Sequence, residues 1–224
     1  MGLIVGIAGI TGRLGSRLAK HLLRDPSVFI LGYCRDPSKV DNGILAEGSA
    51  RIVIHKGDAL DAAKLATFVS PCHVVVGAYY GDNAFMVDAQ KLLIDLCESR
   101  GVPRYVAGDW SLDYTRLGLG ELPPKDPMKT VKEYIESKEK VRGVHVLTGV
   151  FMEILFSPFF GAYDADAKTI KYWGDGTELI ETTTYDNAAE YTANIIKDPS
   201  AVGIQRSKSD EMEWNGMEER MLLN

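Results

Sequence analysis

Cysteine and histidine are scarce in this sequence, which holds three cysteines and four histidines in 224 residues. Cys34, Cys72 and Cys97 are odd in number and lack the spacing of a metal site, so they predict buried, reduced thiols of an intracellular protein. The histidines fall within expected helices and strands and form no catalytic triad, so we expect structural roles for them. The sequence therefore indicates neither a disulfide framework nor a metal centre.

Long apolar runs and an excess of positive charge are also absent. No run approaches the roughly 18 residues that a membrane-spanning helix needs. The N-terminus lacks the positive leader and cleavage site of a signal peptide, and Gly6 stands where a myristoylation motif has Ser or Thr. The 25 basic residues are outnumbered by 31 acidic ones, which argues against general binding to nucleic acid or acidic membranes. We therefore expect a cytoplasmic protein that binds neither.

What the sequence does contain is an alternation of short apolar runs and amphipathic stretches over residues 1–150. The apolar runs are rich in β-branched residues and predict strands at 3–8, 28–34, 51–55, 73–78, 104–107 and 144–148. Helical patterns lie at 13–24, 62–69, 85–100 and 127–138. This alternation is typical of βαβ units, so the sequence predicts an α/β fold, a Rossmann-like doubly wound parallel sheet.

The pattern changes after residue 150. Two segments, 169–173 and 178–184, flank Gly174-Asp175-Gly176 and predict a hairpin. Asp186 or Asn187 is placed to cap a helix at 188–197. The chain is polar and weakly patterned from Gln205 onward. We expect a core domain at 1–150 and a small, abbreviated region at 151–224.

A glycine-rich turn joins the first expected strand to the first expected helix, with the sequence Gly6-Ile7-Ala8-Gly9-Ile10-Thr11-Gly12-Arg13-Leu14-Gly15. In a turn of this spacing one glycine makes the bend, another lets the backbone approach a pyrophosphate, and a third lets helix and strand pack closely. The helix N-terminus then directs free N–H groups at the phosphates. The alternative is a purely structural turn. We favour a dinucleotide site that uses Gly9, Thr11, Gly12, Arg13, Leu14 and Gly15.

The end of the second expected strand bears on the choice between NAD and NADP. NAD sites have a carboxylate there for the ribose hydroxyls, whereas NADP sites have an arginine for the 2′-phosphate. Arg35 stands first at the strand end, and Lys39 and Arg13 can converge with it on one phosphate. Asp36 is the competing residue, either as a ribose ligand or as the cap of the turn after it. The sequence favours NADP(H) as the cofactor.

With these residues in view, the chain resembles the NmrA-like branch of the atypical short-chain dehydrogenase/reductase superfamily. That branch includes isoflavone reductase-like and pinoresinol reductase-like enzymes and many fungal secondary-metabolism proteins. The resemblance covers roughly residues 1–200. It is carried by the order of the matching segments, which are 9–15, 35–39, 56–60, 90–95, 101–106, 173–176 and 182–186.

The resemblance implies further contacts and an oxidoreductase activity. Asp58 and Ala59 would meet the adenine, and Ala78 and Tyr79 would line the cofactor channel. Residues 1–150 would be the NAD(P)-binding domain and 151–224 the substrate-side region, which in the family is usually longer. Asp58 has an alternative role as a helix cap, and Tyr79 as a packing aromatic.

The catalytic residue is less evident. Tyr134 and Lys138 match the Tyr-x-x-x-Lys pattern, but they lie at the end of their helix that is remote from the strand ends where ligands bind. The resemblance implies a lysine on the first turn of this helix, and Lys129 is the nearest candidate. Alignment on Glu136 shifts that position to Met128, and Lys125 or Lys132 are alternatives.

Other candidates follow from position alone. Asp109, Trp110 and Ser111 follow the fifth expected strand, the first two as substrate contacts and Ser111 as an alternative proton donor. Phe151 and Met152 follow the sixth expected strand and form either an apolar substrate wall or ordinary core.

Three functions are compatible with these features. The first is an NADPH-dependent reductase of a small apolar or aromatic ketone or enone. The second is an NAD(P)-binding regulator without catalysis, and the third is a non-redox isomerase or cyclase. In each case the expected partner is a small molecule, and the sequence leaves a homodimer open.

Overall fold

A parallel sheet forms the centre of the computed structural model, which describes residues 2–48, 50–172, 174, 177 and 179–207. Within these residues the sheet has seven strands in the order β11-β6-β5-β4-β1-β2-β3. The strands are β1 (Leu3–Ala8), β2 (Val28–Cys34), β3 (Ile52–Lys56), β4 (Val74–Gly77), β5 (Arg104–Val106), β6 (Arg142–Leu147) and β11 (Gly203–Arg206). The predicted Rossmann-like doubly wound sheet is confirmed.

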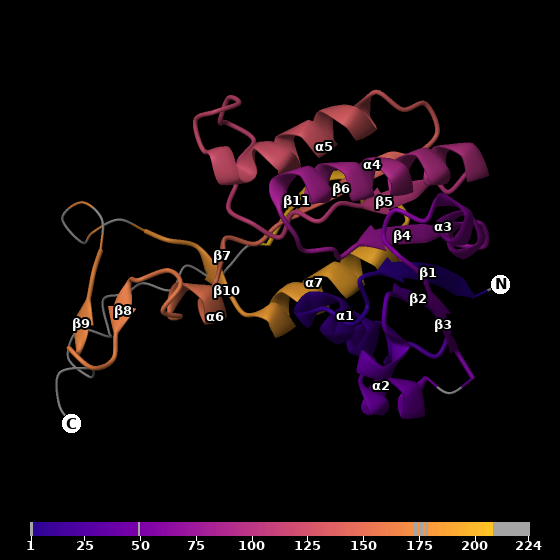
Figure 1. The fold of residues 1–224 in the computed structure, drawn as a ribbon, viewed down its shortest axis with the longest axis horizontal. Helices are drawn as coiled ribbons and strands as arrows, with labels where there is room; N and C mark the ends of the chain where they lie inside the picture. The colour runs from indigo at the N-terminus through magenta and orange to yellow at the C-terminus, as the bar shows by residue number, and fades with distance from the viewer. Residues whose placement is uncertain (1, 49, 173, 175–176, 178, 208–224) are drawn as a thin grey trace.

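Helices cover both faces of the sheet (Figure 1). One layer contains α1 (Arg13–Leu23), α2 (Asn42–Glu47) and α7 (Tyr185–Lys197), and the other contains α3 (Ala62–Val69), α4 (Asn83–Arg100) and α5 (Asp126–Glu136). Leu18 and Leu22 of α1 are fully buried in the first layer, as are Phe68 of α3 and Leu93 of α4 in the second. Because both faces are covered, the central strands are apolar at successive positions. No helix in the described part of the chain is long and apolar enough to span a membrane.

The topology creates a crevice between β1 and β4. From β1 the chain builds outward through β2 and β3, whereas β4 starts the other half with β5 and β6. Helices leave the carboxyl ends of β1 and β4 toward opposite faces, which opens a space between the two loops. Residues that follow the strands at this edge are therefore the ones placed to meet a ligand.

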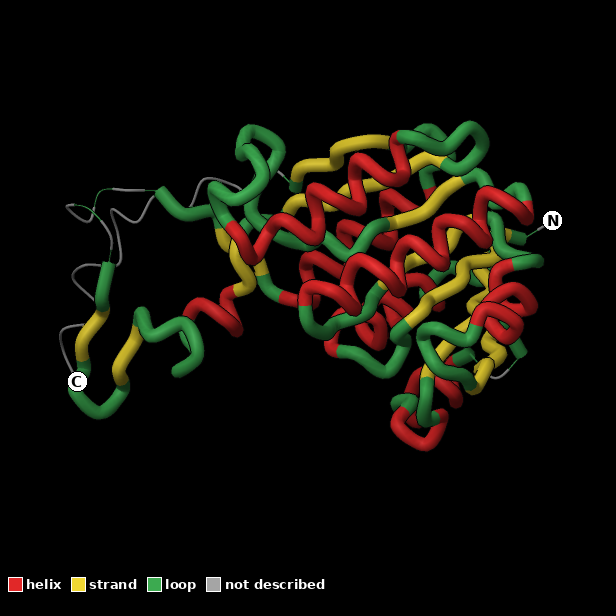
Figure 2. The backbone as a smooth tube through the Cα atoms, turned by 45° about the horizontal axis from the view of Figure 1, so that its top comes forward, coloured by secondary structure: helices red, strands yellow, loops and turns green. Residues whose placement is uncertain are grey.

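The last part of the described chain returns to the sheet. Strand β11 pairs in parallel with β6, and α7 packs against α1. Residues 185–206 thus complete the layers of the sheet domain, although the sequence groups them with the appended region. The described residues between 150 and 184 project away from these layers (Figure 2). They contain β7 (Val150–Phe151), α6 (Met152–Leu155), β8 (Tyr163–Asp164), β9 (Thr169–Ile170) and β10 (Thr182–Thr183).

Two local predictions in this part of the chain are wrong. Strand β9 pairs with the preceding β8, and β10 pairs with β7, so the described strands of the two segments pair with other strands and not with each other. Residues 173, 175, 176 and 178 of that segment lie outside the described residues. The cap of α7 is Thr184, whose Oγ1 accepts a hydrogen bond of 3.1 Å from the backbone N–H of Asn187. Asp186 instead contacts Nε2 of His21 at 3.0 Å.

A buried arginine joins β5 to the end of α7. Arg104 is 7% exposed, and its guanidinium donates to the carbonyl oxygens of Ile196 at 2.7 Å and Asp198 at 2.6 Å. The last carbonyls of a helix lack partners within the helix, and a cation there interacts favourably with the helix dipole. This contact secures α7, and with it one layer of the domain.

We expect Arg104→Met to lower the free energy of unfolding by about 3 kcal/mol, because several charged hydrogen bonds are lost and buried carbonyls are left unpaired. Urea unfolding followed by circular dichroism measures this change. Arg142→Met is the matched control, since Arg142 is the exposed partner of Arg104 in the β5–β6 register and should change stability by less than about 0.5 kcal/mol. Equal losses in both variants would contradict this account.

Candidate functional site

The glycine turn lies at the carboxyl end of β1, beside the segment that follows β4. Gly9 has φ of +90°, and a Cβ there would lie 2.4 Å from the carbonyl oxygen of Ala78, so the position requires glycine. A Cβ on Gly15 would lie 2.4 Å from the carbonyl oxygen of Gly9, so the absence of a side chain lets α1 pack on the turn. Gly12 is the N-cap of α1, and no side chain caps the helix there. The start of α1 therefore offers backbone N–H groups to an anion, as the spacing predicts.

Positively charged side chains without hydrogen-bond partners among the described residues lie at the end of β2. Asp36 accepts hydrogen bonds from the backbone N–H of Ser38 at 3.1 Å and from its hydroxyl at 2.7 Å, and so caps η1 (Pro37–Lys39). These bonds from Ser38 hold the pKa of Asp36 below its ordinary value. The side chains of Arg35 and Lys39 are exposed and make no hydrogen bond or ion pair with the described residues, nor does the guanidinium of Arg13. In the structure Asp36 therefore caps the turn after β2, which is one of the two roles expected for it; the other was that of a ribose ligand.

The segment after β3 is fixed to the end of β2. The hydroxyl of Tyr33 donates to the carbonyl oxygen of Asp58 at 2.7 Å. The carboxylate of Asp58 accepts from the backbone N–H of Leu60 at 3.0 Å, while Asp61 caps α3. Asp58 is therefore not the cap of this helix, and it stands with the buried Ala59 at the same edge as the glycine turn.

The segment after β4 completes this half of the crevice. The backbone N–H of Ala78 donates to the carbonyl oxygen of Ala8 at 2.8 Å, which holds Ala78 beside the turn. Tyr79 follows, and its ring packs against Phe85 with centroids 5.7 Å apart. Its hydroxyl is buried without a hydrogen-bond partner among the described residues. A buried polar group without a partner indicates that a ligand or water completes it.

A buried polar cluster follows β5 and β6. Asp109 is 3% exposed, and its Oδ2 accepts from the hydroxyl of Tyr114 at 3.0 Å and lies 2.6 Å from Nδ1 of His145. Burial and the charge of Asp109 raise the pKa of Tyr114 well above its ordinary value, so Tyr114 is a hydrogen-bond donor. Asp109 Oδ1, Ser111 Oγ and Thr148 Oγ1 are buried without partners in the described part of the chain. These three oxygen atoms could accept or donate hydrogen bonds to a ligand at the edge of the sheet where the strands have their carboxyl ends.

The other expected substrate contacts lie partly in the core. Trp110 is 8% exposed, and its Nε1 donates to Thr192 of α7 at 2.9 Å. Phe151 is half-buried and stacks on Tyr185 with ring centroids 4.0 Å apart. Met152 begins α6 and is also half-buried. Trp110 thus joins the loop after β5 to α7, Phe151 joins the projecting segment to α7, and Met152 follows Phe151 in the chain.

The lysines around the first turn of α5 differ in their contacts. The ammonium of Lys129 is buried and donates to the carbonyl oxygen of Gly118 at 2.5 Å and to Asp126 at 3.0 Å. Lys125, at the end of η2 (Pro123–Lys125), is half-buried, and its ammonium makes no hydrogen bond or ion pair with the described residues. Burial lowers the pKa of Lys125, and the charge of Asp109 opposes that shift. Lys125 lies one helical turn before Met128, so it can reach the face on which the resemblance puts a lysine.

The Tyr134 and Lys138 pair lies at the opposite end of α5. The hydroxyl of Tyr134 donates to Asp95 of α4 at 2.7 Å, and Lys138 also lies 2.7 Å from Asp95. These contacts form a bridge between two helices and use the polar atoms of both side chains.

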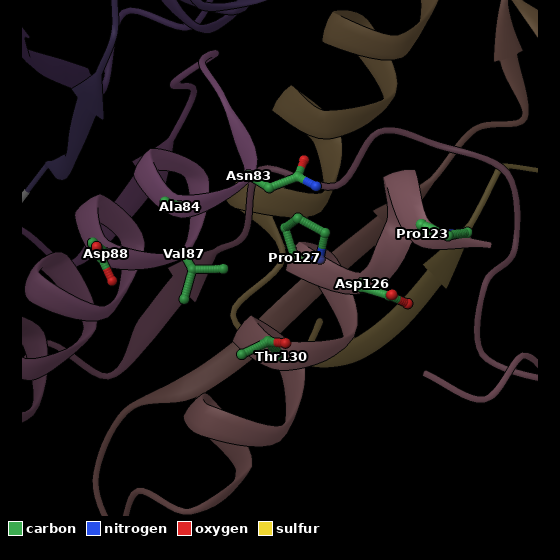
Figure 3. Close-up of a pocket in the computed structure, with 8 residues that line it drawn as sticks. All are labelled: Asn83, Ala84, Val87, Asp88, Pro123, Asp126, Pro127 and Thr130. Carbon is green, nitrogen blue, oxygen red and sulfur yellow. The ribbon is translucent and has the colours of Figure 1, made fainter. Parts of the chain in front are cut away.

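A groove opens between the first turns of α4 and α5 (Figure 3). It has a volume of about 430 Å³, and none of the site residues expected from the sequence lines it. The lining residues are Asn83, Ala84, Val87, Asp88, Pro123, Asp126, Pro127 and Thr130. The described residues hold no cluster of three or more His, Cys, Asp or Glu side chains that fits a metal ion.

Sequence reasoning missed part of the cluster around Asp109. The sequence predicts a structural role for His145, and it does not distinguish Tyr114 or Thr148 as site residues. A polar residue inside an otherwise apolar strand was the available signal for His145, because such a residue needs a buried partner. Tyr114 lies in a loop and gave no comparable signal.

Comparison with known proteins identifies the class. A family model described as NAD(P)H-binding matches residues 9–199, and the chain belongs to this family. An NmrA-like family domain-containing oxidoreductase of Gibberella moniliformis is 27% identical over 114 residues, which are 50% of this chain and 38% of that protein. Pinoresinol reductase 2 of Arabidopsis thaliana is 23% identical over 206 residues, which are 86% of this chain and 64% of that protein. The chain thus spans less than two thirds of the length of these two relatives.

Solved structures share the fold. The structure described as AtPrR2 with NADP+ and (+)pinoresinol has a TM-score of 0.74 at 18% identity, over 92% of this chain and 70% of that one. The binary complex of leucoanthocyanidin reductase with NADPH from Vitis vinifera has a TM-score of 0.70 at 13% identity, over 91% and 66%. An isoflavone reductase gives 0.72 at 18% identity, over 92% and 69%. The resemblance to NmrA-like and isoflavone reductase-like proteins is confirmed.

Proposed function

We propose that the chain is an NADPH-dependent reductase of a small apolar or aromatic ketone or enone. The observation that carries the proposal is the position of Lys125, a half-buried amine with a lowered pKa at the carboxyl edge of an NAD(P)H-binding sheet. The structure fits the cofactor, because the glycine turn leaves the start of α1 uncapped and the hydroxyl of Tyr79 lacks a partner among the described residues. The NADP+ and NADPH in two similar structures support the same cofactor.

The choice of NADPH over NADH rests on the end of β2. Asp36 is engaged with Ser38, whereas the side chains of Arg35 and Lys39 are exposed and make no hydrogen bond or ion pair with the described residues. A 2′-phosphate would be attracted to these cations, and an arginine can hold it through two hydrogen bonds. Lys56 adds positive charge nearby, because it also lowers the pKa of Asp36.

We expect Arg35→Ala to weaken NADPH binding by about 2 kcal/mol, the range of a hydrogen bond to a charged group, and to leave NADH binding nearly unchanged. Fluorescence titration of both nucleotides measures this difference. Arg24→Ala is the control, since Arg24 lies at the other end of α1 near Glu190 and should affect neither nucleotide. A wild-type preference for NADH, or equal losses for the two nucleotides in Arg35→Ala, would overturn the assignment.

Lys125 is proposed as the proton donor. When bound, NADPH supplies a hydride to the carbonyl carbon of a ketone. Lys125 gives a proton to the carbonyl oxygen, so that an alcohol and NADP+ result, and the amine regains its proton from water. A lowered pKa suits this role, because a proton is transferred more readily from an amine whose pKa is nearer neutrality. Lys129, the lysine that the sequence favours, is already bonded to Gly118 and Asp126.

The experiment that tests this function is a search for NADPH oxidation. Purified protein is incubated with NADPH and a panel of aryl ketones and enones, with Gly12→Val as the binding-deficient control. The reductase predicts oxidation with at least one class of acceptor. Tight NADPH binding without oxidation across the panel would favour the NAD(P)-binding regulator or the non-redox enzyme.

A further inference from the structure

A small pocket lies between α1 and α7, which pack against each other in one helix layer (Figure 1). It has a volume of about 70 Å³, and its lining residues are His21, Arg24, Glu190, Ala193, Asn194 and Lys197. One buried water needs about 10–15 Å³, so the pocket has room for a small polyatomic ion. His21 lies about 14 Å along α1 from Gly12, at 1.5 Å per residue, so the pocket is separate from the glycine turn.

His21 brings a buried nitrogen without a partner to this pocket. Its side chain is 4% exposed, and Nε2 lies 3.0 Å from Oδ1 of Asp186 at the start of α7. Nδ1 is buried and has no hydrogen-bond partner among the described residues. A charged imidazole donates from both nitrogens, so the contact with Asp186 leaves Nδ1 to donate to a second acceptor. A buried nitrogen of this kind indicates that a ligand or water completes it.

The other polar side chains of the lining include further donors. Lys197 and Asn194 are exposed, and neither the ammonium nor the side-chain amide makes a hydrogen bond or ion pair with the described residues. An ammonium has three donors and an amide has two. Arg24 adds a second cation at the rim, with a side chain that is 63% exposed. The lining therefore combines two cations, an amide and the free nitrogen of His21.

The carboxylates around the pocket are already engaged. Glu190 is the acidic residue of the lining, and its Oε1 lies 3.6 Å from the guanidinium of Arg24. Asp25, whose pKa is lowered mainly by its hydrogen bonds with Ser27 and further by the charge of Lys197, accepts from the hydroxyl of Ser27 at 2.7 Å. The donors that lack partners in the described part of the chain thus outnumber the free acceptors, which favours an anionic ligand.

We propose that the pocket between α1 and α7 binds a tetrahedral oxyanion, either inorganic phosphate or the phosphate group of a small metabolite. Nδ1 of His21 and the ammonium of Lys197 donate hydrogen bonds to its oxygens from two different helices. The first turn of α1 faces the dinucleotide site, whereas this pocket lies farther along the helix. The oxyanion site is therefore additional to the dinucleotide site, and its occupant stabilises the contact between α1 and α7.

The test follows the imidazole signals of the histidines by NMR while inorganic phosphate is added to protein saturated with NADP+, so that phosphate cannot enter the dinucleotide site. The His21 signal, assigned by its loss in His21→Gln, should show a saturable shift. Lys197→Gln should weaken phosphate binding about tenfold, because a hydrogen bond to a charged group is lost. Lys20→Gln is the matched control and should bind as the wild type does, since Lys20 is paired with Asp41 at 3.0 Å.

The absence of a saturable His21 shift, or equal weakening in Lys197→Gln and Lys20→Gln, would overturn the proposal. A crystal structure of the wild-type protein grown with phosphate covers the case in which His21→Gln does not fold. The ion should contact Nδ1 of His21 and Nζ of Lys197, and an empty pocket or an ion held by exposed side chains alone would overturn the proposal.

A parallel titration with glycerol 3-phosphate separates the two sources of the anion. Tighter binding than that of inorganic phosphate would assign the site to a phosphomonoester, and equal or weaker binding would assign it to the free ion. Both results support an oxyanion site between α1 and α7.

Discussion

Gly12→Val should abolish NADPH binding while the fold is retained. Gly12 has φ of −74° and ψ of 164°, a conformation that valine adopts readily. A Cβ there would lie 3.1 Å from the carbonyl oxygen of Gly9 and 3.6 Å from that of Ala78, so a small adjustment of the turn accommodates it. The added methyl groups would occupy space at the start of α1, where the pyrophosphate must approach the backbone. We expect affinity to fall at least about 100-fold, or about 2.7 kcal/mol.

Titration of NADPH and thermal unfolding together test this prediction. Gly118→Val is the matched control, since the nearest atoms to its Cβ would lie 3.6 Å away in Glu121 and the residue lies in the loop between β5 and η2. It should bind NADPH as the wild type does. Gly9 and Gly15 do not serve this purpose, because a Cβ at either would lie 2.4 Å from a backbone oxygen and damage the turn itself. If folded Gly12→Val binds NADPH with unchanged affinity, the glycine turn is not part of the NADPH site.

The central sheet was predictable because its strands are buried on both faces. Such strands are apolar at successive positions, and this pattern is visible without knowledge of the fold. Strand β11 (Gly203–Arg206) was missed, since an edge strand with exposed and half-buried residues has no apolar run. Helix α2 (Asn42–Glu47) was missed for a similar reason, because Ile44 is its one buried residue. Elements with few buried residues leave a weak pattern in the sequence.

The same reasoning explains what could be predicted of the site. The glycine turn and Arg35 follow from local spacing, because each lies just after a strand whose position is evident. The contact of Asp109 with His145 joins residues 36 positions apart, and no periodicity carries such information. The choice between Lys125 and Lys129 depends on where α5 begins and on which ammonium finds a partner. Both are properties of the folded loop before α5, which has little regular pattern.

Lys125→Met should lower kcat for a reducible ketone or enone by about 100-fold to 10,000-fold, the usual contribution of a general acid. The substitution keeps much of the side-chain volume and removes the ammonium. Lys125 is separated in the chain from the glycine turn and from the cations at the end of β2, so NADPH affinity should change little. The loss should therefore appear in kcat at saturating NADPH, measured by the decrease in NADPH absorbance with an acceptor found in the panel.

Two comparison variants decide between the lysines and the Tyr-x-x-x-Lys pair. Lys129→Met should mainly reduce stability, by about 2 kcal/mol, because it leaves the carbonyl of Gly118 and the carboxylate of Asp126 without their partner. Tyr134→Phe should leave kcat unchanged, since the Tyr134 hydroxyl is bonded to Asp95 at the far end of α5. The helix of 11 residues separates that end from the ligand edge by about 15 Å at 1.5 Å per residue. If Lys129→Met loses most of its kcat while Lys125→Met does not, Lys129 is the proton donor, as the sequence favours. A large loss of kcat in Tyr134→Phe would mean that the substrate binds elsewhere.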